Sequence, residues 1–274
     1  MDDASDDRSC GFLSVPPYST DQRLRLIPGE AQKRTLGRYL DAPQLAKGSI
    51  FKLLDAHHNF SPYWLTNLYD RLRNHNFQAI IGPVVSVLDP ETWETTAAVS
   101  YGWAIDSTLS HCWHLSRKDV SPGRRVDWFS AHQILIPREI YKRIGGFFPL
   151  FRSHGTDDVE LCLRAKLFGY ECFVEPTALI GHLYKSKTIN PVSWADLVCN
   201  YFITVYIILG ERGFENLRSS KEKQPGYQKG LHLFTELRPE VESFRNRLEK
   251  EQRCSGEEII ARLADRIELT TIKN

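Results

Sequence analysis

Asp55 and His57 follow an apolar run and offer one oxygen and one nitrogen ligand. The run extends from Ile50 to Leu54 and reads as a strand that ends in the acid. Side chains two residues apart in an extended chain point the same way, so these two can converge on one ligand. The carboxyl end of a parallel strand is also where open α/β sheets bind their ligands. Such donors suit Mn²⁺ or a similar divalent ion, which can stabilise a diphosphate leaving group.

The same residues also allow a purely structural interpretation, in which Asp55 caps the next helix and His57 lies in a surface loop. A second candidate ligand is His182, which follows an apparent strand and turn within the segment 178–184. A lone histidine is more often structural than a ligand. Its assignment to a metal therefore depends on its lying beside Asp55 and His57.

The elements that must position these residues follow the pattern of an α/β layer fold, because short apolar runs alternate with longer amphipathic ones. Strands are predicted at Leu24–Pro28, Ile50–Leu54, Ala79–Val87, Trp128–Ile136 and Glu171–Glu175. Helices are predicted at Ala31–Lys47, Pro62–Asn74, Pro137–Ile144 and Asp157–Phe168. We expect a mixed sheet flanked by helices.

The character of the chain changes near Asn190, where apolar residues begin to recur at helical spacing. The segment 197–209 is predicted to be helical, 212–225 to be a polar loop, and 237–269 to form a charged helical pair. The simplest role for that pair is to cover the core, and binding of an acceptor is the alternative. We divide the chain into residues 1–187 and a helical C-terminal region, residues 188–274.

Composition excludes several classes of function. With 35 basic and 34 acidic residues, the chain has no global field to attract nucleic acid or an anionic membrane, so no nucleic-acid partner is predicted. Six scattered cysteines without a CxxC pair suggest neither a zinc site nor a disulfide framework. Acids stand near Met1, where a signal peptide would have basic and then apolar residues, and the apolar run 197–209 is too short to cross a bilayer. We predict no transmembrane segment and a cytoplasmic protein.

The order of motifs resembles the GT-A glycosyltransferases of the family 2 type, and among them the catalytic domains of the polypeptide N-acetylgalactosaminyltransferases. The matching segments are Asp2-Asp3-Ala4-Ser5-Asp6-Asp7, Ala46-Lys47-Gly48, Leu54-Asp55-Ala56-His57, Tyr63-Trp64-Leu65 and Gly181-His182-Leu183. The resemblance covers roughly residues 1–187. It implies an α/β GT-A fold, a Rossmann-like domain for nucleotide-diphospho-sugars.

Site residues follow from the resemblance, position by position. In the family the Asp and His of the Asp-x-His motif and a later histidine bind the metal, which implies Asp55, His57 and His182 as ligands of Mn²⁺ or Mg²⁺. The Asp-Asp segment binds the nucleoside, which implies Asp2 and Asp3. We place Arg34 and Arg38 near the donor diphosphate. Asp55 is also assigned to donor binding, because it would hold the metal that binds the diphosphate.

A pair of acids, Asp157 and Asp158, opens a predicted helix after Gly155, where the family also has a glycine, acids and a helix. In inverting members an acid of this stretch is the general base, which removes a proton from the acceptor hydroxyl. Asp158 is the first choice and Asp157 the second. Because a helix dipole favours acids in any first turn, a structural role for one of them stays equally open.

Three departures from the family pattern qualify the resemblance. The loop 150–155 does not carry the Trp-Gly-Gly of the polypeptide N-acetylgalactosaminyltransferases, which weakens the expectation of that donor or of a peptide acceptor. The C-terminal region reads as helical and not as a lectin domain. The family has a strand, a helix and a second strand before its Asp-Asp segment, so we expect the sequence to begin after its first β-α-β unit, a truncation that puts activity in question.

The resulting hypothesis is a metal-dependent glycosyltransferase that moves a hexosyl or N-acetylhexosaminyl group from a UDP-sugar to a hydroxyl of a glycan or peptide, with inversion. A retaining enzyme with the same metal site is the first alternative. A non-catalytic binding protein on a degenerate GT-A scaffold is the second. Weak candidates for acceptor binding are His111, His114, His132, Trp103, Trp113 and Trp128, since tryptophan faces suit sugar rings.

Overall fold

The computed structural model describes residues 2, 4–29, 41–119, 125–153, 155–184 and 193–271, and the chain divides into two compact units, residues 1–47 and 48–274. The first unit contains two short 3₁₀ helices, η1 (Gly11–Ser14) and η2 (Tyr18–Thr20). The strand predicted at Leu24–Pro28 was wrong. Among the described residues of this segment Pro28 alone pairs, in a single bridge to Asp2, and Leu24 and Leu26 are exposed, with no described strand beside them. The helix predicted at Ala31–Lys47 lies largely outside the described residues, and residues 41–45 of it are helical.

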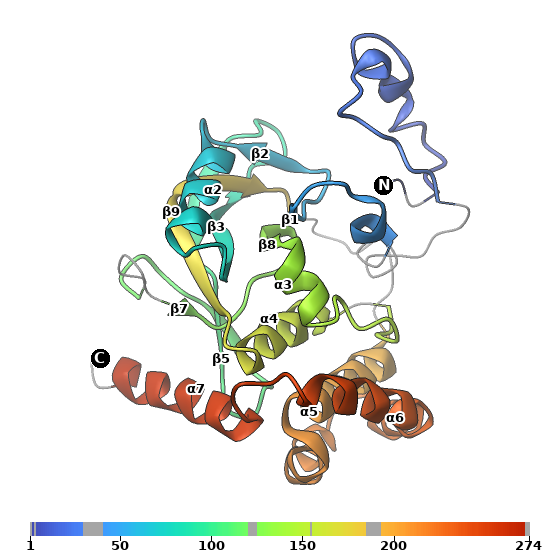
Figure 1. Cartoon of the computed structure of the whole chain (residues 1–274), viewed down its shortest axis with the longest axis vertical. Coiled ribbons are helices and arrows are strands. Elements are labelled where there is room, and N and C mark those ends of the chain that lie inside the picture. The colour runs from blue at the N-terminus through green and yellow to red at the C-terminus, as the bar shows by residue number, and fades with distance from the viewer. Residues whose placement is uncertain are drawn as a thin grey trace. The chain divides into compact units, whose positions relative to one another are not determined.

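The second unit is built on a mixed sheet of seven strands in its described part (Figure 1). The central order is β1 (Ile50–Lys52), β8 (Leu135–Pro137), β3 (Ala79–Leu88), β9 (Glu171–His182) and β2 (His58–Phe60). Strand β4 (Thr95–Ser100) pairs with β3, and β7 (Arg125–Val126) pairs with β9. Among these described strands β3 and β9 form the one parallel pair.

Two neighbouring strands carry the centre of the sheet. Strand β3 is an almost continuous apolar run that is buried along its length, as expected for a strand covered on both faces. Strand β9 runs past the predicted end at Glu175, although Pro176 follows. The pairing register with β3 shifts between Pro83 and Val84, and such irregularities are where a strand accommodates proline. The strand therefore continues to His182.

Three helices close around the sheet: α2 (Trp64–Asn74), α3 (Arg138–Arg143) and α4 (Asp157–Leu167). Helix α2 buries Leu68 and Leu72 against residues of β3, β8 and β9. Every residue of α4 except Asp158 is buried. The strand predicted at Trp128–Ile136 is instead a 3₁₀ turn, η3 (Ala131–Gln133), followed by the short β8, because Ser130 and Gln133 form a capping box around the turn.

The C-terminal region is helical, as predicted. It consists of α5 (Trp194–Leu217), η4 (Arg218–Lys221), α6 (Tyr227–Glu249) and α7 (Gly256–Thr271), with α5 and α6 packed together (Figure 1). The loop predicted at 212–225 was wrong in its first half, because the helix continues to Leu217. Gly210, with φ of 68°, breaks the helix, and the chain resumes it so that Phe214 is buried against Phe202 and Phe234.

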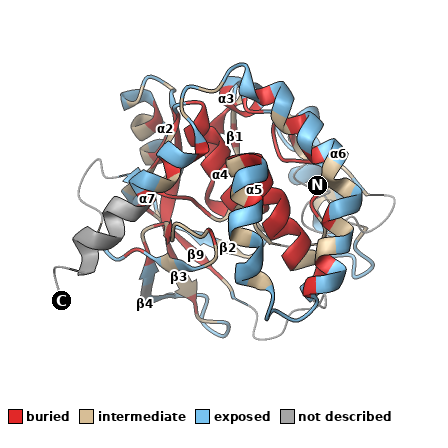
Figure 2. Ribbon diagram, turned by 90° about the horizontal axis from the view of Figure 1, so that it is seen from below, coloured by how far each residue is buried: buried red, intermediate tan, exposed pale blue. Residues whose placement is uncertain are grey.

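One helical segment, Trp194–Lys221, is long and apolar enough to cross a membrane by length and composition alone. In its most apolar window 83% of the residues are buried inside the protein. Figure 2 shows buried residues gathered in the interior and exposed residues on the outer sides of the helices. A buried core helix passes the same test, so this is weak evidence for a membrane span.

A fully buried ion pair joins α4 to its surroundings. The guanidinium of Arg164 bonds the carboxylate of Glu160 through Nε at 2.5 Å and Nη2 at 2.8 Å, and neither side chain is exposed to solvent. Arg164 also donates to the carbonyls of Ile144 and Gly146, and its guanidinium lies 5.1 Å from the centre of the Phe244 ring. The pair therefore ties α4 to the turn after α3 and to α6.

Candidate metal and donor site

Asp55, His57 and His182 come together, and their ligand atoms all lie within 4.8 Å of one another. The convergence does not arise from strand alternation, because β1 ends at Lys52 and pairs antiparallel with β8, so the expectation of a parallel strand end was wrong. It arises because β2 pairs with the end of β9, which sets His58 opposite His182. The capping alternative for Asp55 fails as well, because the residue that precedes α2 at its cap is Tyr63.

The electrostatics of the cluster favour a cation. Burial of Asp55 opposes ionisation of its carboxyl. The contact with His182, together with the charges of His132 and His57, outweighs this effect and lowers the pKa of the carboxyl below its usual value. The Asp55 Oδ2 atom lies 3.4 Å from His182 Nε2, a contact without hydrogen-bond geometry. Among the described residues neither ring nitrogen of the buried His182 has a hydrogen-bond partner. Buried nitrogens in this state fit a metal ligand, since an unpaired polar group is otherwise costly.

Two further histidines, which sequence reasoning did not place among the ligands, complete the cluster. His58 Nδ1 lies 2.9 Å from the carbonyl oxygen of Asp55, and His58 Nε2 lies 3.0 Å from His132 Nδ1. Burial lowers the pKa of His58 to about 4. Lys52 donates from Nζ to the carbonyl of His132 at 2.8 Å, and burial lowers the pKa of this lysine. The doublet His57-His58 was the one sequence signal that could have drawn attention to His58.

The residues predicted to bind the donor nucleotide are only partly described. Asp2 belongs to the first unit, where its carboxylate accepts bonds from the backbone N–H and the hydroxyl of Ser5, at 3.3 and 2.5 Å. Asp3, Arg34 and Arg38 lie outside the described residues. Their assignment to the donor stays a prediction.

The acid pair stands at the start of α4, as predicted. Asp158 accepts bonds from the backbone N–H groups of Val159 at 2.8 Å and Ala131 at 3.2 Å. Although Asp158 as a whole residue is half-buried, its carboxyl group is removed from solvent, and this burial, followed by the charge of Asp157, raises the pKa of Asp158 to about 8. Because Ala131 precedes His132 in η3, the bond links the acid pair to the turn that carries one of the clustered histidines. The catalytic role of either acid stays a prediction.

The histidines and tryptophans predicted as weak candidates for acceptor binding differ in how far they are exposed to solvent. Trp128 is buried and stacks on Trp103 at a ring distance of 4.8 Å, so it belongs to the core and offers no free face to a sugar. Trp103 in turn packs on His114, between β5 (Trp103–Ile105) and β6 (Cys112–His114). Trp113 is half-buried, and His111 is exposed.

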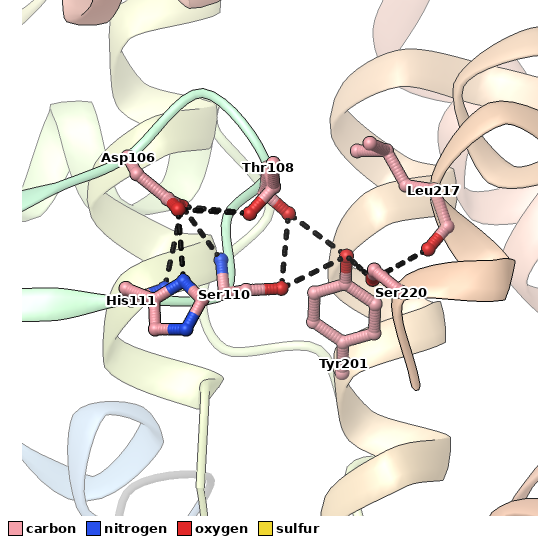
Figure 3. Close-up of polar contacts among 7 residues, drawn as sticks. All are labelled: Asp106, Thr108, Ser110, His111, Tyr201, Leu217 and Ser220. Carbon is pink, nitrogen blue, oxygen red and sulfur yellow. Dashed lines mark hydrogen bonds and ion pairs between the residues drawn. The ribbon is translucent and has the colours of Figure 1, made fainter. Parts of the chain in front are cut away.

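The loop that joins β5 and β6 is fixed to α5 (Figure 3). Asp106 accepts bonds from Thr108, Ser110 and His111 within the loop. The hydroxyl of Tyr201 on α5 donates to the carbonyl of Thr108 at 2.8 Å, and its oxygen lies 3.2 Å from Ser220 Oγ. This network holds the loop on which His111 stands against the helical region.

Tyr201→Phe is expected to destabilise the protein by about 1 kcal/mol, because it removes a hydrogen bond of the half-buried Thr108 carbonyl while keeping the ring. Urea unfolding measures the change. Tyr63→Phe is the matched control, since Tyr63 is 78% exposed. An equal effect of the two substitutions would contradict the role assigned to the Tyr201 hydroxyl.

Comparison with known proteins relates the chain to glycosyltransferases. No family model matches the chain. It is 21% identical over 173 residues to polypeptide N-acetylgalactosaminyltransferase 15 of Mus musculus, which covers 61% of the chain and 27% of that protein. It is 24% identical over 200 residues to polypeptide N-acetylgalactosaminyltransferase 3 of Taeniopygia guttata, covering 69% of the chain and 32% of that protein.

Among solved structures, the crystal structure of GalNAc-T7 with UDP, GalNAc and Mn²⁺ superposes with a TM-score of 0.72 at 16% identity, covering 96% of the chain and 48% of that protein. The chain has a GT-A glycosyltransferase fold. This confirms the fold and the family resemblance predicted from the motifs. The GT-A chain spans about half of the crystallised protein and about a third or less of the curated relatives.

The relatives of this chain are named as transferases. The alternative of a non-catalytic binding protein is therefore not favoured. GalNAc-T7 was crystallised with a nucleotide and Mn²⁺, and the GT-A chain has a cluster of aspartate and histidines that could hold such an ion. Fold and ligand chemistry therefore agree.

Proposed function

We propose that the chain contributes the catalytic part of a metal-dependent glycosyltransferase that moves a sugar from a nucleotide diphosphate, with UDP as the nucleotide, to a hydroxyl of a glycan or peptide. The observation that carries the proposal is the convergence of Asp55, His57 and His182, with ligand atoms within 4.8 Å. The relatives and the fold support the same class of reaction. A hexosyl or N-acetylhexosaminyl group is the proposed cargo.

The metal would be held by the Asp55 carboxylate and the imidazoles of His57 and His182. Mn²⁺ or Mg²⁺ supplies positive charge that stabilises a diphosphate leaving group. The low pKa of Asp55 keeps its carboxylate ionised for this task at neutral pH. Half-buried Lys52 fixes the backbone at Leu53 and His132 through two bonds of 2.8 Å, and so steadies the turn that presents the ligands.

The donor nucleoside is proposed to contact Asp2 and Asp3, and its diphosphate Arg34 and Arg38. The support is the order of motifs along the chain. The proposed partners are therefore a nucleotide-sugar donor and a glycan or peptide acceptor. The cytoplasmic location stays a prediction, because neither the relatives nor the fold indicates a compartment.

Inversion with Asp158 as the base is the proposed course, and its pH dependence follows from the raised pKa. If deprotonated Asp158 takes the acceptor proton, kcat/KM falls about tenfold for each pH unit below about 8, since the free enzyme must lose that proton first. A pH–rate profile from 5.5 to 9 measures this. In the retaining alternative the pair only binds hydroxyls, so a profile that is flat around 8, together with retained stereochemistry of the product, would exclude the base role.

Calorimetric titration of UDP into the protein tests the proposed function directly. With Mn²⁺ present, binding is expected in the wild type, and it is expected to disappear with EDTA and in Asp55→Ala. If metal-loaded wild-type protein does not bind UDP, the same titration on a chain extended upstream distinguishes an incomplete nucleotide pocket from a scaffold without this chemistry. Absence of binding in the extended chain too would refute the proposal.

A further inference from the structure

His58, His132 and His182 form a cluster that uses imidazole groups alone, beside the proposed site for Mn²⁺. Their ligand nitrogens all lie within 4.8 Å of one another. The ring centres of His132 and His182 are 4.4 Å apart, and each lies 5.0 Å from the ring centre of His58. The cluster shares only His182 with the group of Asp55, His57 and His182.

The backbone positions of these three residues are fixed without any ion. His58 begins β2 and His182 ends β9, and the two residues are directly paired. His132 lies in η3, which is fixed by its capping box and by the bond from Lys52 Nζ to the His132 carbonyl. His132 and His182 are each 8% exposed. Ligand positions on paired strands and a capped turn are pre-organised, which is what a metal site requires.

The hydrogen bonds set the tautomer of His58. A carbonyl oxygen can only accept, so His58 Nδ1, which lies 2.9 Å from the Asp55 carbonyl, carries the proton. In the neutral ring Nε2 is then a lone pair that points at His132 Nδ1, 3.0 Å away. This is the arrangement of a histidine ligand whose second nitrogen donates to a backbone carbonyl.

The separation of the nitrogens also suits one ion. Two nitrogens bound at about 2.0–2.1 Å to a tetrahedral zinc ion lie about 3.3 Å apart, close to the separation of the His58 and His132 nitrogens. Binding of the ion by His58 Nε2 and His132 Nδ1 breaks the hydrogen bond between them and releases the proton of His132 Nδ1 to solvent. His182 has both ring nitrogens without a hydrogen-bond partner among the described residues, so it adds the third ligand without breaking a further bond.

We propose that His58, His132 and His182 are a second divalent-metal site, which binds Zn²⁺ and, through the shared His182, excludes Mn²⁺ from the first site. Imidazole ligands suit zinc, and affinity rises from Mn²⁺ to Zn²⁺ across the first-row series, whereas a carboxylate suits manganese. Zinc is thus an inhibitor of the transferase reaction proposed above. The exclusion of manganese rests on that proposal, and the binding of zinc does not.

The test compares two matched substitutions in the full chain stripped of metal. His132→Asn keeps an N–H near the position of Nδ1, so it can still donate to His58. It is expected to weaken Zn²⁺ binding at least about a hundredfold, since loss of even an outer partner of a ligand costs about 10–100-fold. Binding of Mn²⁺, followed by its electron paramagnetic resonance signal, is expected to change less than about threefold. His57→Asn is expected to show the reverse pattern.

X-ray absorption of the zinc-loaded wild type gives the number and kind of the zinc ligands. It uses no variant, so it does not depend on whether a variant folds. Three imidazole ligands are expected, whereas two imidazoles and a carboxylate would mean that zinc takes the first site and the proposal is wrong. Adding Zn²⁺ to the Mn²⁺-loaded protein is expected to release one Mn²⁺ per zinc bound. Equal loss of both metals in the two variants, at unchanged melting temperature, would also overturn the second site. None of these measurements uses UDP. Zinc binding can therefore be established or excluded even if the proposed transferase function is wrong.

Discussion

Asp55→Asn is expected to reduce sugar transfer at least about a thousandfold while the protein stays folded. Asparagine has nearly the shape of aspartate but carries no charge, so the proposed metal loses its one anionic ligand. A bound ion contributes several kcal/mol to stabilising a charged leaving group, and about 4 kcal/mol corresponds to a factor of about a thousand. Release of UDP from the sugar donor at saturating Mn²⁺ measures the change.

The matched control for this substitution is Asp70→Asn. Asp70 pairs with Arg73 on the surface of α2, where its side chain is 45% exposed. This variant is expected to keep activity within about twofold, because exposed pairs contribute about 0–1 kcal/mol. If Asp55→Asn retained a tenth of wild-type activity at saturating metal, the role of the carboxylate as a ligand would have to be abandoned.

Glu160→Gln is expected to lower the free energy of unfolding by about 3–5 kcal/mol. The substitution leaves the guanidinium of Arg164 charged, fully buried and without its counter-ion, which is the costly way to break a buried pair. The two carbonyl partners of Arg164, at Ile144 and Gly146, cannot supply the missing negative charge. Denaturant unfolding of the variant and the wild type gives the difference.

Glu215→Gln serves as the comparison for that experiment. Glu215 near the end of α5 pairs with Arg218, the first residue of η4, and both side chains are nearly half exposed. Its replacement is expected to cost less than about 1 kcal/mol. Equal losses in the two variants would show that burial of the Glu160 pair adds nothing to its contribution.

Local patterns predicted most of the second unit. The apolar run of β3, the amphipathic period of α2 and the acids at the start of α4 each act within one element, so periodicity and capping are enough to predict them. Two of the errors fell where an element depends on distant parts of the chain. The chain around Leu24 has strand-like residues but no partner strand in the part of the chain that the structure describes. The segment after Gly210 is helical because α6 packs on it.

The candidate site shows the same limit. Asp55 and His57 could be found from their spacing. His182 could be named as a candidate from its place after a strand and turn, but only the resemblance assigned it to the same metal, because the pairing of β2 with β9 joins segments far apart in sequence. His58 and His132 could not be assigned, since a three-residue strand and a single 3₁₀ turn leave almost no periodic signal. Their grouping is a property of the assembled sheet.

The pairing of His58 with His182 also has a kinetic consequence. The two ends of the metal site are separated by most of the second unit along the chain, and contacts of this kind form late because ordering the intervening segment costs entropy before they stabilise anything. A metal ion that bridges them acts on the native state and hardly on the folding nucleus, so it slows unfolding more than it accelerates folding. Metal loading would then prolong the lifetime of the folded chain, and loss of metal would shorten it, at an almost constant rate of folding.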